Sequence, residues 1–513
     1  MAPGKYDVLI IGAGISGLAC GTFLAKQGLR VGILEQHTVP GGYCHSFKRG
    51  PYIFDAAVEY IGCCGKNQDV TNALRLLGAN NYVAFDELNP QAFDRIHLPQ
   101  HDVDVCKGAD RFMLRLADLF PSERRGLRRY FSVLNGIWKD VHAWGFALYL
   151  WEYGRFPSQC RSLRRYSGRS LGDLFNETIK SPKLRGILAG QSGNYALPPS
   201  QVDLAVHAVT IMHFHEGAYY PRGGVQNFSD GLARALDKQG GKLFLQTSVK
   251  RIRVLAGQTK GVELESGKCL DSRIVITSTD PQGTRRLLEG EDVDIFEHYS
   301  NVQYSLSSFQ LYLGVQLDPR LGASNHWVSP SYDFEKIYQQ IMSGRIHRKM
   351  YFLLSAMSQK DQSGKLAPKG HHVLKIITPV SHSMFSKWRS TSLGRRGNDY
   401  QDLKKRMADL LLDQASEYVP GLKNAIRCMV IGTPLTNVHY ARAYQGAMYG
   451  IARTPEQSGE HGFKPRTSVH GLYLTGTNIY YPGVLGALGS GIMSGSVVLR
   501  ELKISRVSSS MGR

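Results

Sequence analysis

The sequence has few cysteines and no arrangement that pairs them in a usual way. Its eight cysteines are scattered over 513 residues, and no C-x-x-C motif or zinc-type spacing occurs among them. Cys63 and Cys64 are adjacent, which places them poorly for a disulfide with each other. These absences argue against a disulfide scaffold and indicate a reduced, intracellular protein, either cytoplasmic or organellar.

Long hydrophobic runs are also missing. No stretch approaches the roughly 20 consecutive apolar residues of a membrane-spanning helix. The apolar run Val8–Ile11 is short and leads directly into glycines, which is not typical of a secretory signal. We therefore expect any contact with a membrane to be peripheral.

Negative charge is under-represented. Asp and Glu number 42 against 62 Lys and Arg, which gives a formal net charge of +20. This excess attracts anions, including cofactor phosphates, nucleic acid and acidic membrane surfaces. No helix-turn-helix, zinc-finger or RNA-recognition pattern is present, so nucleic acid is not an expected partner.

Segment 121–170 gathers many of the arginines and three of the five tryptophans, Trp138, Trp144 and Trp151. Aromatic rings beside cationic side chains suit the surface of a lipid bilayer. They also suit the wall of a tunnel for a long apolar substrate, or a helical cap packed on its own domain. The sequence leaves these three alternatives open.

A glycine-rich turn near the start of the chain carries the clearest signal. Val8–Ile11 is a continuous apolar run, as expected of a strand buried on both faces, and Gly12, Gly14 and Gly17 follow it with G-x-G-x-x-G spacing. The first glycine permits a tight turn, the second lets a pyrophosphate approach the backbone, and the third allows close packing of helix on strand. A second strand, 30–34, ends at Glu35, an acid suited to accept hydrogen bonds from ribose hydroxyls.

The residues around these glycines complete the pattern. Ile15 and Ser16 open a helix whose N-terminal amides favour phosphate, Gly28 is a suitable stop for that helix, and Gln36 follows the acid. Strand, glycines, helix, strand and acid in this order predict a dinucleotide site. A glycine turn in a nucleotide-free Rossmann fold is the alternative.

Further blocks determine which dinucleotide is expected, because together they resemble the flavin-binding segments of the amine oxidase and phytoene desaturase superfamily. The blocks are "VPGGYCHSFKRGPYIFDAAVEYIG" (39–62), "YYPRGGVQNFSDGLARAL" (219–236), "GGKLFLQTSVKRI" (240–252), "IVITSTDPQ" (274–282) and "GLYLTGTNIYYPGVLGALGSGIMSG" (471–495). Within that superfamily the phrases "FDAAVEYIG", "GTPLTNVHY", "QGAMYG" and "YPGVLGAL" are similar to those of retinol saturases and carotenoid isomerases.

The resemblance implies an α/β fold: a Rossmann-type FAD-binding domain (GR2-like flavoprotein) with an inserted mixed α+β substrate domain. The FAD-binding domain would be discontinuous, formed by 1–75, 216–290 and 431–513. Segments 76–215 and 291–430 would form the substrate-binding and lid domain.

The resemblance also implies FAD as cofactor and carries a set of contact residues over to this chain. Where the family usually has Asp or Gln after the glycine of the closing motif, this chain has a hydroxyl and an amide, which can still bond the ribityl chain or a phosphate. Beyond the opening turn, the expected FAD contacts are Gly41, Gly42, His45, Ser46, Val249, Gly476, Thr477, Asn478, Gly483 and Val484.

Three residues are candidates for catalytic roles. Glu59 occupies a place where the saturase-like pattern tends to have His, and a carboxyl in an apolar pocket can donate a proton near neutral pH. Tyr60 is suited to bond a substrate oxygen, and Arg222 to face the flavin or a substrate head group. The alternatives are a structurally paired glutamate, a packing tyrosine and a structural ion pair. Asp55 is expected to be structural, held by a basic residue or by backbone amides.

His213 and His215 in "MHFHEG" have a spacing that suits one face of a strand. No third ligand is evident in the sequence, so we expect no metal site there.

The predicted function is that of an FAD-dependent oxidoreductase or isomerase acting on C=C bonds of a hydrophobic polyene or isoprenoid lipid, retinoid-like or carotenoid-like, by hydride or electron exchange with flavin N5. Saturation, desaturation and cis–trans isomerisation stay open. No second G-x-G-x-x-G follows, so electrons are expected from the substrate cleft or from an external donor or acceptor. Two further alternatives are an amine oxidase with a smaller polar substrate and a non-catalytic prenyl-lipid carrier of related fold.

Overall fold

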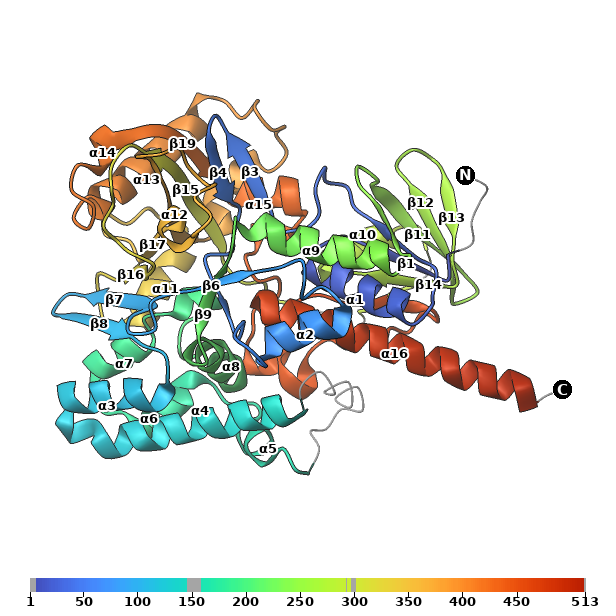
Figure 1. The fold of residues 1–513 in the computed structure, drawn as a ribbon, viewed down its shortest axis with the longest axis horizontal. Helices are drawn as coiled ribbons and strands as arrows, with labels where there is room; N and C mark the ends of the chain where they lie inside the picture. Colours follow the sequence, from blue (N-terminus) through green and yellow to red (C-terminus); the bar gives the residue numbers. More distant parts are fainter. Residues whose placement is uncertain (1–5, 145–157, 292, 297–300, 512–513) are drawn as a thin grey trace.

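The computed structural model describes residues 6–144, 158–291, 293–296 and 301–511 (Figure 1). Its two largest sheets are a five-stranded parallel sheet and a seven-stranded mixed sheet, which lie at opposite sides of the molecule in Figure 1. The N-terminal and C-terminal parts of the chain meet at the parallel sheet.

The parallel sheet has the strand order β10-β2-β1-β14-β20. The strands are β1 (Val8–Ile11), β2 (Val31–Leu34), β10 (Lys242–Phe244), β14 (Ile274–Thr277) and β20 (Leu472–Leu474). Val8 pairs in register with Val31 on one side and Ile274 on the other. Its central strands β1, β2 and β14 are buried along their whole length, which is why they read as continuous apolar runs.

Helices α1 (Ile15–Lys26) and α16 (Gly483–Met511) pack closely on each other beside this sheet (Figure 1). Glycines on α16 permit the close approach: a Cβ at Gly491 would lie 2.4 Å from the carbonyl oxygen of Ser16. Helix α1 ends at Lys26 and the chain reverses at Gly28, which has φ +83°, as the sequence predicted.

Helix α16 corrects one expectation from the sequence. Among the described residues, Gly483–Leu502 is long and apolar enough, by length and composition, to cross a membrane, with a mean hydropathy of 1.3. Glycines and serines interrupt its apolar run, so the stretch did not stand out in the sequence. However, 67% of its most apolar window is buried inside the protein, as in the core helix of a globular domain.

Beside the parallel sheet lie smaller elements from the middle of the chain. Helix α9 (Val225–Lys238) also packs on α1. A three-stranded antiparallel sheet has the order β11-β12-β13. Its strands are β11 (Val249–Leu255), β12 (Gln258–Leu264) and β13 (Cys269–Asp271), and α10 (Pro281–Leu287) follows β14.

The mixed sheet has the strand order β19-β15-β18-β17-β16-β7-β8, and in it only β7 and β16 pair in parallel. Its strands are β7 (Asp94–Leu98), β8 (His101–Val105), β15 (Ser307–Val315), β16 (Asn325–Val328), β17 (Phe352–Ala356), β18 (His372–Val380) and β19 (Ile426–Gly432). One face packs on α13 (Asn398–Ala415), where Leu311, Ile376 and Leu411 share a buried cluster. The other face contributes polar residues to the site described below.

A helical layer lies below the mixed sheet in Figure 1. Its members are α3 (Ala109–Leu119), α4 (Arg124–Trp144), α5 (Arg161–Tyr166), α6 (Leu171–Thr178), α7 (Pro182–Leu188) and α8 (Leu204–His215). Helix α8 is buried almost all round, and α4 packs against it.

The remaining elements connect these layers. A hairpin of β3 (Ser46–Arg49) and β4 (Tyr52–Asp55) leads into a small sheet of order β5-β9-β6. The other bounds are β5 (Ile61–Gly62), β6 (Phe85–Glu87), β9 (Ala218–Pro221), α2 (Asp69–Leu77), α11 (Phe334–Met342), α12 (Met357–Lys360), α14 (Leu422–Ala425) and α15 (Pro434–Ala441).

The strands of the parallel sheet fall within the three segments expected to bind FAD, and those of the mixed sheet fall almost entirely within the two expected to bind substrate. The division into these two domains stays a prediction.

The tryptophan-rich segment is partly described. Trp138 on α4 is 5% exposed and its indole N–H donates to Glu216 at 3.3 Å, so it belongs to the core rather than to a surface belt. Trp151 and the side chain of Trp144 lie outside the described residues. The arginines at positions 124, 125, 128 and 129 are exposed on α4.

Candidate active site

A cavity of about 580 Å³ is lined by residues from both large sheets. This volume is in the usual range of cofactor and ligand sites. One part of the cavity lies at the carboxyl ends of β1 and β2, where open α/β sheets bind their ligands. Another part is lined by Glu59, Tyr60, Phe214 and Ile377, on the side of the mixed sheet.

The glycine turn forms the first part. Gly12 has φ +95° and its N–H donates to the carbonyl of Leu34 at 2.8 Å. A Cβ at Gly17 would lie 2.1 Å from the carbonyl oxygen of Gly12, so Gly17 serves helix packing and does not itself line the cavity. A Cβ at Gly14 would meet no protein atom within 4 Å and would occupy the cavity itself. An open cradle at Gly14, at the N-terminus of α1, fits a pyrophosphate.

Glu35 and Gln36 lie beside this turn and line the cavity. The Glu35 carboxylate accepts hydrogen bonds from the N–H groups of Ala13 at 2.7 Å and His37 at 2.8 Å. These bonds hold the carboxylate against the glycine turn. Since a carboxylate has about four acceptor positions, it keeps capacity for a ribose hydroxyl.

Gly41 and Gly42 lie against the same turn. The N–H of Gly41 donates to the carbonyl of Ala13 at 2.8 Å, and a Cβ at Gly42 would lie 3.2 Å from the Cα of Gly14. Both glycines have positive φ and both line the cavity. The structure thus brings two separate glycine turns together.

His45 and Ser46, expected as cofactor contacts, are not among the residues that line the cavity. The His45 Nδ1 lies 2.5 Å from the carbonyl of Gly42 and buttresses that loop. Ser46 begins β3, and its hydroxyl donates to Asp55 at 2.6 Å. Their expected contact with FAD stays a prediction.

The C-terminal block closes the cavity. Gly476, Thr477, Gly483 and Val484 line it, as does Asn478, and the N-terminus of α16 faces it. A helix N-terminus stabilises a negative charge that lies close to it. Asn478 also has a structural task, because its side-chain oxygen accepts the N–H of Ile451 at 2.9 Å. Of the more distant expected contacts, Val249, the first residue of β11, lines the cavity as well.

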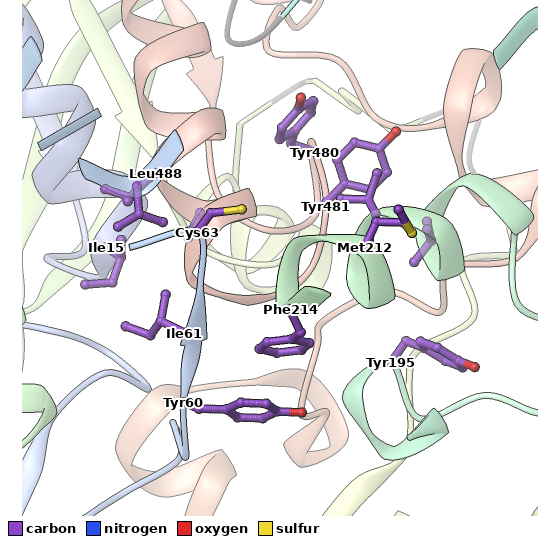
Figure 2. Close-up of a cluster of buried hydrophobic side chains, with 14 of the residues drawn as sticks. Ile15, Tyr60, Ile61, Cys63, Tyr195, Met212, Phe214, Tyr480, Tyr481 and Leu488 are labelled. Carbon is purple, nitrogen blue, oxygen red and sulfur yellow. The ribbon is translucent and has the colours of Figure 1, made fainter. Parts of the chain in front are cut away.

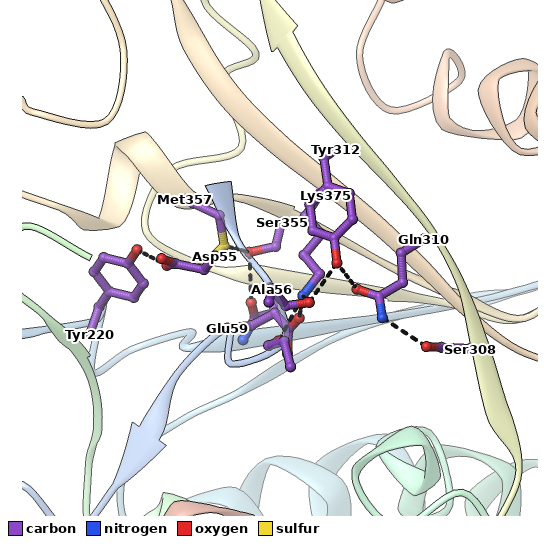
Figure 3. Close-up of polar contacts among 12 residues, drawn as sticks. Asp55, Ala56, Glu59, Tyr220, Ser308, Gln310, Tyr312, Ser355, Met357 and Lys375 are labelled. Carbon is purple, nitrogen blue, oxygen red and sulfur yellow. Dashed lines mark hydrogen bonds and ion pairs between the residues drawn. The ribbon is translucent and has the colours of Figure 1, made fainter. Parts of the chain in front are cut away.

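On the side of the mixed sheet, Glu59 forms an ion pair with Lys375 of β18, 2.6 Å from Nζ to Oε1 (Figure 3). The side chains are 15% and 1% exposed, respectively. Lys375 also donates to the carbonyls of Ala56 and Ala57, at 3.2 and 2.7 Å, and so fastens the loop that carries Glu59. The apolar pocket expected around Glu59 is therefore corrected: its carboxylate faces an ammonium group.

A second buried lysine supports the same loop. Lys360 is 3% exposed, and its Nζ donates to the backbone carbonyl of Glu59 at 3.0 Å, to the hydroxyl of Ser355 at 2.6 Å and to the side chain of Asn325. Burial lowers the pKa of Lys360 to about 7. A group that titrates near neutral pH thus supports the loop that carries Glu59.

Tyr60 lines the cavity with its ring and is fixed by hydrogen bonds. Its hydroxyl donates to Asp94 at 2.9 Å and accepts from Asn194 at 3.1 Å, and its ring stacks on Phe214 with centroids 4.0 Å apart (Figure 2). Burial raises the pKa of Tyr60, so the phenol stays protonated. With its proton committed to Asp94, Tyr60 acts as a packed wall residue.

Asp94 is fully buried and accepts hydrogen bonds from four side chains. The donors are Tyr60, Gln191, Asn325 and Trp327. Burial raises the pKa of Asp94, and these hydrogen bonds oppose that rise.

Arg222 does not reach the cavity. Its guanidinium pairs with Asp86, 2.6 Å from Nη2 to Oδ1, and its side chain is 50% exposed. The structural ion pair, the alternative in the sequence, is what the structure shows. Asp55 is structural as expected: it accepts from the backbone N–H of Val225 at 3.2 Å, and from Ser46 and Tyr220.

His213 and His215 lie on helix α8, not on a strand. Within the described part of the chain, no group of three or more His, Cys, Asp or Glu side chains is placed to hold a metal ion. His213 lines the cavity, whereas the Nδ1 of His215 bonds the backbone carbonyl of Cys106.

Sequence reasoning missed Lys375, Lys360, Asp94 and Phe214. A charged residue inside the apolar strand "HVLKIITPV" is a signal that was available for Lys375. Asp94 and Phe214 lie in segments without a motif, and their approach to the cavity depends on pairing between distant strands and helices.

Comparison with known proteins agrees with this architecture. A family of NAD(P)-binding Rossmann-like domains matches residues 10–77. All-trans-retinol 13,14-reductase from Danio rerio is 28% identical over 97% of this chain and 87% of its own length. Prolycopene isomerase 1, a chloroplastic protein of an Oncidium hybrid cultivar, is 27% identical over 98% and 85%. The structure of an oxidoreductase from Methanosarcina mazei superposes with a TM-score of 0.66 at 16% identity, covering 95% of this chain and 99% of that one.

The chain combines a Rossmann-type dinucleotide fold with a cavity that extends onto a second sheet, and its relatives over the full length are named as a reductase and an isomerase. The full-length similarity is more specific. Over nearly its whole length the chain is similar to retinol reductases and prolycopene isomerases.

Proposed function

We propose that this protein binds FAD and acts on a C=C bond of a hydrophobic polyene or isoprenoid lipid, as a saturase, desaturase or cis–trans isomerase. One observation carries the proposal: a single cavity joins the glycine turns of Gly14 and Gly42 to the buried wall of Glu59, Tyr60 and Phe214. The two named relatives, a retinol reductase and a prolycopene isomerase, support the substrate class.

The proposed FAD contacts follow the geometry. Glu35 would bond the ribose, Gly14 and Ser16 at the N-terminus of α1 would hold the pyrophosphate, and Val249 would lie at the adenine end. Thr477 and the N-terminus of α16 would face the ribityl chain and the ring. When bound, FAD supplies hydride or electron exchange at its N5 position.

The chain's own residues would position the polyene and supply the proton that saturation adds to one carbon of the double bond. Phe214, Tyr60 and Ile377 offer flat or apolar surfaces. Glu59, which is paired with Lys375, adds a carboxylate to this part of the wall. Saturation adds a hydride to one carbon and a proton to the other. A carboxylate paired with an ammonium group can donate that proton only after taking it from the ammonium, so we assign the proton to the pair rather than to Glu59 alone.

Two partners follow from this chemistry and charge. Saturation consumes two electrons per double bond, so an external donor must supply them, and desaturation requires an acceptor. The exposed arginines of α4 support peripheral contact with an acidic membrane in a cytoplasmic or organellar setting. Sedimentation with anionic and neutral lipid vesicles tests this contact, and equal binding to both would contradict it.

The test of the cofactor is the visible spectrum of the purified protein, followed by anaerobic photoreduction. We expect a flavin spectrum that bleaches on reduction, and release of FAD on denaturation. A colourless protein that takes up no FAD would refute the proposal and would favour a lipid carrier.

The test of the reaction is incubation with all-trans-retinol and with a poly-cis carotenoid, with and without reduced flavin. A product two mass units heavier indicates saturation, one two units lighter indicates desaturation, and a new isomer of equal mass indicates isomerisation. Hydrogen peroxide formation with diamines and no change in either polyene would overturn the proposal in favour of an amine oxidase.

A further inference from the structure

Segment 439–445, which we call the strap, lies over the nucleotide end of the main cavity. It consists of the last turn of α15 and the residues that follow it. Tyr440, Arg442 and Ala443 line the cavity, whereas Tyr440, Arg442 and Gln445 are exposed to solvent. Two of these residues thus face both the cavity and the solvent, so the strap is a single layer of chain between them.

The strap is tied to turns that follow three strands of the parallel sheet, β2, β10 and β14. The hydrogen bonds run from the Gln36 side chain to the Tyr440 carbonyl at 3.4 Å, from the Arg442 guanidinium to the Ser248 hydroxyl at 3.0 Å, and from the Tyr444 N–H to the Asp280 carboxylate at 2.6 Å. The carboxyl ends of such strands are where open α/β sheets bind their ligands. The strap therefore bridges the edge of the sheet at which a dinucleotide would lie.

This bridge is weakly fastened at its centre. Arg442 and Gln445 have φ of +50° and +54°, a left-handed conformation that is unfavourable for residues other than glycine. The bond to the Tyr440 carbonyl is long, and the bond from Arg442 to Ser248 lies at the protein surface. A segment with an unfavourable backbone and few buried contacts opens at a small cost in free energy.

We propose that the strap is a gate for the cofactor: it opens to admit FAD to the glycine turns and closes over it, and the bond between Arg442 and Ser248 is its clasp. This inference rests on the proposed binding of FAD and adds the route by which FAD enters. The clasp joins two parts of the chain rather than the chain and the cofactor. Breaking it should therefore raise the rates of entry and exit alike and leave the dissociation constant of FAD unchanged.

The test measures how fast FAD enters and leaves. Ser248→Ala breaks the clasp without changing the charge of the cavity. Entry is followed by the change in flavin fluorescence when FAD is mixed with flavin-stripped protein, and exit by exchange of bound FAD for an excess of radiolabelled FAD. We expect both rates to rise about fivefold in Ser248→Ala, as the loss of one net hydrogen bond implies.

Two arginine variants separate the clasp from an effect of charge. The double variant Ser248→Ala, Arg442→Ala should release FAD no faster than Arg442→Ala alone, because both changes break the same bond. Arg286→Ala is the matched control, since Arg286 also lines the cavity and is exposed, but its guanidinium makes no hydrogen bond within the described part of the chain. This control should not speed entry, because it only removes a positive charge that attracts the phosphates of FAD.

The outcomes distinguish the gate from its alternatives. Faster exit of FAD from Ser248→Ala without faster entry, and so a larger dissociation constant, would mean that Ser248 binds FAD directly and would overturn the inference. Unchanged rates in Ser248→Ala would also overturn it. Both results leave the proposed function intact, whereas failure of the unaltered protein to take up FAD would refute the proposed function itself.

Discussion

The ion pair between Glu59 and Lys375 makes a prediction that separates its role in stability from any role in catalysis. Lys375→Met removes a buried ammonium group while keeping most of the aliphatic stem. Both partners are nearly enclosed, at 15% and 1% exposure, so solvent screens the pair little. The variant leaves the Glu59 carboxylate without its counter-charge.

The expected cost follows from these contacts. Removing one partner of a buried ion pair costs about 3–5 kcal/mol. Lys375 also donates to the carbonyls of Ala56 and Ala57, and each buried carbonyl left without a donor costs about 1–3 kcal/mol where water does not replace it. We therefore expect Lys375→Met to lower the free energy of unfolding by at least about 3 kcal/mol. Glu59→Gln should cost less, about 2 kcal/mol, because Lys375 keeps its two carbonyl acceptors.

Equilibrium urea denaturation of the two single variants and the double variant measures the coupling. If the pair acts as a unit, the double variant should lose at least about 1 kcal/mol less than the sum of the singles. Lys387→Met is the control, since its ion pair with Asp399 is 72% and 50% exposed and should contribute less than about 1 kcal/mol. Additivity within about 0.5 kcal/mol would refute the view that these charges stabilise each other.

Three other predictions address the remaining parts of the site. Gly14→Ala should fold with unchanged thermal stability but purify without flavin, because its Cβ would occupy the cavity. Gly17→Ala should be less stable by about 1–3 kcal/mol, because its Cβ would meet the carbonyl oxygen of Gly12. Flavin content and thermal melting distinguish the two variants. The pKa of Lys360 is lowered from 10.5 to about 7 in the folded protein. Between these two pH values Lys360 is protonated in the unfolded chain but not in the folded one. This residue therefore makes the free energy of unfolding rise with pH from about 7 to 10. In Lys360→Met that rise should be smaller by up to about 1.4 kcal/mol per pH unit, and parallel pH profiles for the two proteins would contradict it. Arg222→Ala should change turnover by less than about twofold, and a hundredfold loss would restore the catalytic role that its position outside the cavity argues against.

The part of the site that sequence predicts well is the part built from local chemistry. Gly12, Gly14 and Gly17 are each required by the backbone of the same short turn, for its tight bend, its open space or its close helix packing. Their spacing can therefore be recognised in the sequence. The same holds for Glu35, placed by the end of the next strand. The closing block is readable because its glycines lie where α16 begins and packs on α1.

The other part depends on contacts between distant segments. Lys375 meets Glu59 only because β18 of the mixed sheet passes under the loop between β4 and β5, and no local pattern encodes that approach. His45 and Ser46 are close to Gly42 in sequence but do not line the cavity, so closeness in sequence alone does not place a side chain on its wall. Trp138 shows the same limit, since its burial is decided by packing of α4 on α8.

The two ends of the cavity differ in physical character, and this difference bears on how the protein can vary. The glycine end relies largely on backbone atoms, so most substitutions of its glycines remove space or change the turn. The end at the mixed sheet relies on side chains such as Tyr60, Phe214 and His213, none of which belongs to a glycine turn. Changes of substrate should therefore concentrate at the second end while the cofactor stays the same. Two relatives agree with this expectation. One is named for a retinol reaction and the other for a prolycopene reaction, although their identities to this chain are nearly equal.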